Sequence, residues 1–167
     1  MKTAADDGER SRTMLQAKSE ALKLLAVRPR SVRELEERLR RKKHAQAVIL
    51  QVVEELKRQG LLDDEKFAKL YAHSRIYTKP VSKKKIEEDL KRKGVSGDIA
   101  QKTLVSFGED EKARARELIL RRFEKMTGIS DEKKKMRLYG FLKRRGFGSE
   151  VIFGVLGELF QGVEAFE

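Results

Sequence analysis

The sequence predicts an all-α protein built from three tandem three-helix repeats that form an elongated, curved array. One pattern carries most of this prediction, because Leu39, Leu90 and Leu142 are each followed directly by three basic residues. An aliphatic residue lies four positions before each leucine, which places two apolar side chains on one helical face. Further apolar residues follow each leucine at the same spacings in every copy, so the pattern is an internal repeat. Charged residues make up 40% of the chain, which is typical of surface-rich helical proteins.

Proline and serine mark the start of the second helix in the first two repeats. Pro29 and Pro80, the two prolines of the chain, lie ten residues before their leucines, and Ser31 and Ser82 follow them. Proline cannot continue an incoming helix, and a serine hydroxyl can accept a hydrogen bond from the first turn of the next helix. Ser31 and Glu34 also have the spacing of a capping box. These positions therefore separate the first helix of each repeat from the second.

Glycine marks the end of the second helix. Gly94 and Gly146 lie four residues after their leucines, where a left-handed residue ends a helix at low cost. Lys43 takes this place in the first repeat, so we expect a less regular turn there. The predicted helices span residues 14–27, 31–42 and 45–59, then 64–77, 82–93 and 97–107, then 110–126, 131–145 and 149–160. The predicted organisation is a disordered tail at 1–13, repeat 1 at 14–61, repeat 2 at 62–108, repeat 3 at 109–162 and a C-terminal tail at 163–167.

Residue types that catalysis or metal binding requires are scarce. The chain has no cysteine and two histidines, and neither His44 nor His73 has a spaced partner that would complete a metal site. We interpret both as surface or boundary residues. Acidic clusters at 63–65 and 109–111 stand where first helices begin, so we expect them to cap those helices rather than to bind magnesium. No phosphate-binding loop motif occurs, and we expect no enzymatic activity, no metal and no cofactor.

The net charge of +12 indicates the class of partner. All of the excess lies in residues 13–167, because basic and acidic side chains cancel in residues 1–12. A field of this size attracts polyanions, which in the cytosol are chiefly nucleic acids. A charged surface that serves solubility alone stays an alternative. The longest apolar stretch, 151–157, is far shorter than the roughly 20 residues that span a bilayer, and we expect a cytoplasmic protein with no membrane partner.

The cations gather on the second helices and on the first helix of repeat 3. Cations in a last helical turn also complement the helix dipole, but three repeated triplets exceed that need. We expect these side chains to contact phosphate groups with weak sequence preference. The candidate nucleic-acid or filament-binding residues are Arg40, Arg41, Lys42, Lys83, Lys84, Lys85, Lys91, Arg92, Lys93, Arg114, Arg121, Arg122, Lys143, Arg144 and Arg145.

A helix-turn-helix DNA-binding protein is the main alternative, because helices two and three of each repeat have roughly that form. The third helices are expected to expose acidic residues such as Glu54, Glu55 and Glu158, and their charge opposes insertion into a groove. We interpret the third helices as packing elements. A stand-alone nucleic-acid-binding protein without a protein partner nevertheless remains open.

Several segments resemble the RecX family of recombinase regulators. These are Leu-Leu-Asp-Asp-Glu-Lys-Phe-Ala at 61–68 and Glu-Asp-Leu-Lys-Arg-Lys-Gly-Val at 88–95, and the segments 21–25 and 36–39 are similar too. The resemblance covers about residues 15–160. It implies a three-repeat helical protein that binds the filament of RecA recombinase on single- or double-stranded DNA. It also implies inhibition of the ATPase, strand exchange and co-protease activities of that filament in DNA repair, with no catalytic residues. We expect a monomer, since the sequence shows no leftover apolar face.

Overall fold

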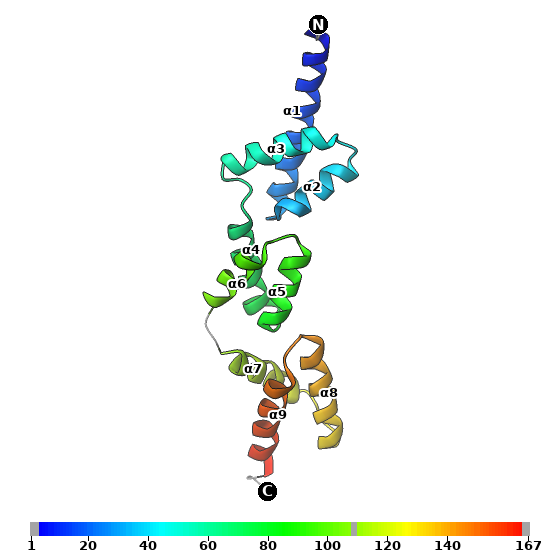
Figure 1. The fold of residues 1–167 in the computed structure, drawn as a ribbon. Helices are drawn as coiled ribbons and strands as arrows, with labels where there is room; N and C mark the ends of the chain where they lie inside the picture. The colour runs from blue at the N-terminus through cyan, green and yellow to red at the C-terminus, as the bar shows by residue number, and fades with distance from the viewer. Residues whose placement is uncertain (1–3, 108–109, 165–167) are drawn as a thin grey trace. The chain divides into compact units, whose positions relative to one another are not determined.

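The computed structural model describes residues 4–107 and 110–164, and every regular element within these ranges is helical (Figure 1). Repeat 1 contains α1 (Ala4–Val27), α2 (Val32–Arg41) and α3 (Gln46–Arg58). Repeat 2 contains α4 (Asp64–His73), the π-helical turn η1 (Ser74–Thr78), α5 (Lys83–Arg92) and α6 (Gly97–Val105). Repeat 3 contains α7 (Glu111–Phe123), α8 (Asp131–Arg144) and α9 (Ser149–Glu164). The all-α class and the three three-helix repeats are confirmed.

The N-terminal segment and the first helix of repeat 2 differ from the predicted structure. Helix α1 begins at Ala4, inside the stretch 1–13 that was expected to be a disordered tail. Extending a helix that is already formed costs little per residue, whereas starting one is expensive. The first helix of repeat 2 was expected to run to residue 77, but it changes to π-helical geometry at Ser74. The predicted repeat boundary at 108–109 and residues 165–167 of the predicted tail lie outside the described residues.

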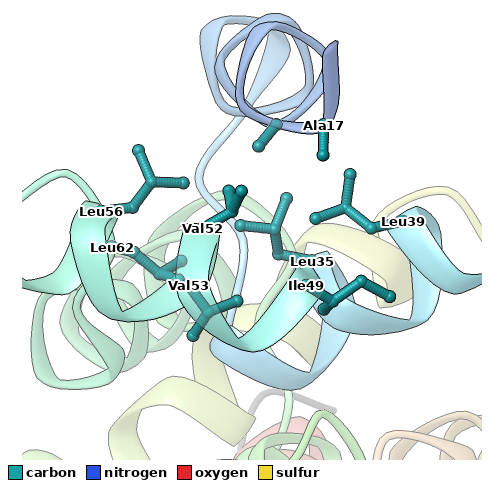
Figure 2. Packing of buried hydrophobic residues seen from close by; sticks show 9 residues of the cluster. Ala17, Leu35, Leu39, Ile49, Val52, Val53, Leu56 and Leu62 are labelled. Carbon is teal, nitrogen blue, oxygen red and sulfur yellow. The ribbon is translucent and has the colours of Figure 1, made fainter. Parts of the chain in front are cut away.

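The chain divides into two compact units, and the division runs through repeat 2. Unit 1 comprises residues 1–71 and 90–103, and unit 2 comprises residues 72–89 and 104–167. The core of repeat 1 lies in unit 1, where Leu35 and Leu39 of α2 pack with Val52 and Leu56 of α3 (Figure 2). Ala17 of α1 completes this cluster, and its short side chain leaves room for the leucines of α2. All five residues are fully buried.

Unit 2 contains the core of repeat 3. Leu138 and Leu142 of α8 lie in one cluster with Ile119 of α7 and Ile152 of α9. Phe147, in the turn after α8, belongs to the same cluster. Ridges of aliphatic side chains one turn apart on each helix produce this packing, as the period of the sequence predicted. The leucines that define the repeats are all fully buried, as are the aliphatic residues four positions before them.

The turn after the second helix has the same geometry in all three repeats. Gly94 and Gly146 both have φ of +85°, and Lys43 has φ of +66°. In each turn the second residue after the three basic positions donates its backbone N–H to the carbonyl of the defining leucine, at 3.1–3.3 Å. The expectation of a less regular turn at Lys43 was therefore wrong. A lysine tolerates the left-handed region at a cost of about 1–2 kcal/mol, and local hydrogen bonds offset it.

Within unit 1, the start of α2 is joined to the end of α5 and the start of α4; we call this set of contacts the first joint. Ser31 Oγ accepts a hydrogen bond from the Glu34 N–H at 3.1 Å and donates one to the Lys93 carbonyl at 2.6 Å. Asp64 Oδ1 accepts the Val32 N–H at 2.9 Å. The Glu34 carboxylate accepts a hydrogen bond from Lys93 Nζ at 2.7 Å. Ser31 thus caps its helix as predicted, while Glu34 pairs with Lys93 of the next repeat.

Within unit 2, the start of α5 is joined to the end of α8 and the start of α7 in the same way; this is the second joint. The Ser82 N–H donates to the Arg145 carbonyl at 3.0 Å, and Ser82 Oγ accepts the Lys85 N–H at 3.0 Å. Glu111 Oε1 accepts the Lys83 N–H at 3.0 Å. Each joint therefore satisfies the orphan donors at the start of a helix with a carboxylate from the following repeat.

Acid is expected to weaken the first joint through Glu34. Partial burial raises the pKa of this carboxyl, but hydrogen bonds from Arg28 and Lys93 outweigh it and lower the pKa from 4.5 to about 2. Because the folded pKa is depressed, the stabilisation is present above about pH 4.5 and is lost as the pH falls toward about 2. Wild-type protein should therefore lose more unfolding free energy than Glu34→Gln between about pH 6 and about pH 3, measured by urea denaturation. A constant difference between the two proteins would contradict this prediction.

Candidate nucleic-acid interface

The basic triplet of repeat 1 is exposed, and two of its members have polar partners. Arg40 Nη2 donates to Gln46 Oε1 at 3.3 Å, and Lys42 Nζ lies 3.3 Å from the Glu20 carboxylate. Arg41 is exposed at the end of α2. Arg40 also lines a pocket in unit 1 whose wall carries both basic and acidic side chains. The charged lining residues are Arg33, Glu36, Glu37, Arg40, Lys57, Asp63 and Asp64. Local carboxylates therefore compensate much of the positive charge here.

The last residue of the triplets in repeats 2 and 3 has a structural role. Lys93 is half-buried and bonds Glu34 in the first joint, and Arg145 is half-buried and donates to the Pro80 carbonyl in the second joint. The first two residues of these triplets are exposed in both repeats. The sequence assigned all three positions of each triplet to phosphate contacts. The structure shows instead that the first two positions of these triplets are exposed, while the third position belongs to a joint.

The upstream triplet at residues 83–85 divides similarly. Lys84 is exposed, while Lys83 and Lys85 are half-buried. Lys85 Nζ lies 3.8 Å from the Glu88 carboxylate and 4.0 Å from that of Asp89. The backbone of Lys83 belongs to the second joint. Lys84 is thus the member of this triplet that projects farthest into solvent.

Three of the predicted cations meet at a pocket of about 420 Å³ in unit 2, which we call the arginine pocket. Arg114 and Arg121 of α7 line it, together with Arg145 at the end of α8. The opposite wall comes from the π-helical turn η1 and the residues after it, Ile76, Tyr77, Thr78 and Pro80. Glu117 of α7 is the acidic residue among the described lining residues, and it pairs with Arg121.

A second basic pocket of about 580 Å³ lies between α7 and α8, and we call it the α7–α8 pocket. It contains the predicted residues Arg122 and Arg144 and two residues that the sequence analysis missed, Lys125 and Arg137. Their spacing was the available signal, because Lys125 lies one turn after Arg122 and Arg137 lies two turns before Arg144. None of the described residues that line this pocket is acidic. Lys143 is exposed at the end of α8 and its Nζ lies 3.5 Å from Ser149 Oγ.

Phe141 connects the two basic pockets. The guanidinium carbons of Arg122 and Arg145 each lie 4.7 Å from the centre of its ring. Both arginines are attracted to the electron-rich faces of the aromatic ring, which holds them without neutralising their charge. The ring thus allows like-charged side chains from α7 and α8 to gather on one surface, and five predicted cations lie there.

The acidic clusters act in capping, and part of this role crosses between repeats. Asp63 Oδ1 accepts the backbone N–H groups of Glu65 and Lys66, and Asp110 Oδ1 accepts that of Ala113 at 2.7 Å. The neighbouring carboxylates of the two clusters, Asp64 and Glu111, belong to the joints. Glu109 lies outside the described residues. Within the described ranges no group of three potential ligands could hold a metal ion.

Two acids that were expected to be exposed on third helices, and one histidine, are paired within the protein. Glu55 accepts a hydrogen bond from Lys18 Nζ at 2.6 Å, so it is half-buried rather than exposed. Glu158 pairs with Lys112 at 2.5 Å. His44 Nε2 lies 3.0 Å from the Glu20 carboxylate, and its side chain is 9% exposed, so it is not a plain surface residue. These pairs join third helices and turns to first helices.

An apolar groove of about 670 Å³ between α8 and α9 was not anticipated. Phe153 and Met136 line it with 64% and 77% of their surfaces exposed, and Tyr139 lies beside Phe153 at 5.6 Å between ring centres. Lys135 is at its rim. The sequence analysis found no leftover apolar face, so the groove at Phe153 and Met136 corrects that expectation.

Among the described residues, no helix is both long enough and apolar enough to cross a membrane.

Comparisons with known proteins agree on one family. Models of the first, second and third three-helix domains of RecX match residues 17–56, 63–104 and 109–156. Regulatory protein RecX of Chlorobium limicola is 37% identical over 147 residues, which cover 87% of this chain and 91% of that protein. Regulatory protein RecX of Amycolatopsis mediterranei is 34% identical over 143 residues, covering 85% and 82%.

Solved structures agree with the fold. The crystal structure of RecX from Lactobacillus salivarius superposes with a TM-score of 0.75 at 21% identity, covering 90% of this chain and 99% of that one. A crystal structure of regulatory protein RecX gives a TM-score of 0.76 at 19% identity, covering 95% of this chain and 79% of that one. The matches to all three domain models and the identity to full-length relatives show that this chain belongs to the RecX family of regulatory proteins.

Proposed function

We propose that this chain binds the filament of RecA recombinase on DNA and lowers its ATPase, strand exchange and co-protease activities. The observation that carries the proposal is the gathering of five predicted arginines in two adjoining pockets on α7 and α8 of a RecX family member. Phosphate contacts of this kind fix the position of a protein on nucleic acid without reading bases. Filament binding requires such positioning and no defined DNA sequence.

Two further features support a nucleoprotein partner rather than DNA alone. The acidic residues Glu55 and Glu158 on α3 and α9 are paired with lysines of first helices, so these third helices act in packing rather than in base recognition. The groove at Phe153 and Met136 offers the kind of exposed apolar surface that protein partners bury. A cytoplasmic, monomeric protein that acts without a cofactor or catalytic residue is consistent with this role and forms part of the proposal.

Titration of the protein into RecA filaments on single-stranded DNA tests the proposed function. The rate of ATP hydrolysis should fall with added protein and reach a plateau, because bound molecules interfere with filament growth and turnover. The control is RecA-free DNA binding by the same preparation, which shows that the added protein is active. An ATPase rate that stays constant at concentrations that saturate DNA would contradict the proposal.

A stand-alone nucleic-acid-binding protein is the second candidate, because the basic pockets would also contact the phosphates of DNA that carries no recombinase. Neutralising about six phosphates of single-stranded DNA would give a log–log salt slope near −4. Protection of a defined operator sequence, with binding that tolerates salt, would favour this candidate over a filament regulator. Uniform binding to unrelated sequences together with ATPase inhibition favours the filament.

A further inference from the structure

The arginine pocket has the architecture of an anion site. Arg114 and Arg121 lie on one face of α7, since seven residues make close to two turns, and Arg145 enters from the end of α8. Arginine side chains from two helices thus line a space of about 420 Å³. The wall opposite α7 includes η1, and π-helical turns are rare and frequently occur at functional sites.

Arg114 has hydrogen-bond donors that no described residue of the chain satisfies. Its Nε and Nη2 are buried, and neither has a hydrogen-bond partner in the part of the chain that the structure describes. Burying a charged donor without an acceptor costs free energy, so such groups normally face a ligand or another acceptor. Arg121 and Arg145 differ, because they donate to Glu117 and to the Pro80 carbonyl. Among the three arginines of the pocket, Arg114 is therefore the one whose buried donors bond to no described residue.

The charge of the pocket selects an anion. The described lining residues of the pocket include three arginines and one acidic residue, Glu117. Partial burial, followed by the nearby charges of Arg122 and Arg75, lowers the pKa of Arg145. Because arginine stays protonated at physiological pH, the lowered pKa reports the burial of this guanidinium first and the neighbouring positive charges second, rather than a titration. An anion that enters the pocket would offset both the burial and the repulsion between these cations.

The arrangement fits a phosphate better than a carboxylate. A phosphate group offers acceptor oxygens in several directions, while a carboxylate offers two oxygens in one plane, and guanidinium groups bind either one bidentately. Arginines that approach from two helices match the tetrahedral group. At the rim, Tyr77 is 66% exposed and the Thr78 side chain adds a hydroxyl. An exposed aromatic ring beside a phosphate pocket is suited to stacking on a base of a single strand.

We infer that the arginine pocket binds a phosphate group of the nucleic-acid backbone, with Arg114 as its buried anchor. The inference rests on the proposed function for its source of phosphate, the DNA of the filament. The binding chemistry itself does not depend on the recombinase. Arg114 contributes to DNA binding through a specific hydrogen-bonded contact with phosphate, whereas the exposed lysines of the triplets contribute through their charge alone.

Nuclear magnetic resonance of the full-length protein tests the pocket directly. The Arg114 Nε–H signal, assigned by its loss in Arg114→Lys, should shift on titration with inorganic phosphate and stay unchanged with acetate at the same ionic strength. A shift with acetate alone would overturn the inference in favour of an acidic protein partner. No shift with either anion would overturn it as well. Inorganic phosphate that binds but is not displaced by oligothymidylate would overturn the assignment to nucleic acid.

A matched pair of variants tests the contribution to DNA binding. Arg114→Gln should weaken binding of a labelled oligothymidylate about tenfold, as expected for the loss of a charge-assisted hydrogen bond. Arg116→Gln changes the charge of the same helix by the same amount at an exposed position, and its effect should be less than about threefold. Thermal melting followed by circular dichroism verifies the fold of both. Equal affinities of the two folded variants would overturn the inference.

The two proposals fail separately. If Arg114→Gln and Arg116→Gln bind DNA equally while the wild-type protein still inhibits filament ATPase, the pocket inference is wrong and the proposed function stands. If Arg114→Gln binds DNA more weakly while the wild-type protein leaves filament ATPase unchanged, the proposed function is wrong and phosphate binding by the pocket stands.

Discussion

Replacing Gly94 with alanine is expected to lower the free energy of unfolding by about 2–4 kcal/mol. Two effects add at this position. Its φ of +85° lies in the left-handed region, which costs an alanine about 1–2 kcal/mol. A new Cβ would also lie 2.5 Å from Arg33 Cδ and closer still to Arg33 Cβ, so the first joint must open to admit it. Urea denaturation followed by circular dichroism measures the loss.

Gly60→Ala separates the two effects. Gly60 also has positive φ, +67°, but the nearest atom to an added Cβ is the flexible end of Lys66 at 3.9 Å. We therefore expect a cost of about 1 kcal/mol there, which reflects backbone conformation alone. If Gly94→Ala and Gly60→Ala destabilise the protein equally, close packing in the first joint contributes nothing to stability.

Reversing the charge of Arg122 and Arg144 together is expected to produce the largest functional loss. Both are exposed in the α7–α8 pocket, whose described lining residues include no acid. Losing two phosphate contacts at about tenfold each should raise the concentration needed for half-maximal inhibition of filament ATPase about 100-fold. Titration of Arg122→Glu/Arg144→Glu against RecA filaments measures the change.

The matched control is Lys69→Glu/Lys102→Glu. These two lysines are exposed in unit 1 and belong to neither basic pocket, yet the double variant changes the net charge by the same amount. Inhibition curves that superimpose for the two double variants would show that overall charge, not this surface, determines filament binding. Variants of Lys93 are unsuitable for this comparison, because that residue also supports the first joint.

The helical framework was predictable because its determinants are local. Leu39, Leu90 and Leu142 are fully buried, as their period required, and the predicted helix at 131–145 is observed at 131–144. Serine capping and positive φ at the turn glycines also depend on neighbouring residues alone. Lys43 was misjudged because glycine is sufficient for a left-handed turn but not necessary for one.

The sequence alone therefore determined the helices, the repeat register and the family resemblance, since all of these depend on short spacings and composition. The basic character of the proposed partner surface was predicted on the same grounds. The tertiary structure decided which cations line the two basic pockets and which support the joints. Nothing in the triplets distinguishes Lys93 or Arg145 from the basic residues beside them, and their roles depend on Ser31 and Ser82 more than sixty residues away. Likewise, the buried Arg114 donors find no acceptor among the described residues because of what surrounds them in three dimensions, not because of their neighbours in the chain.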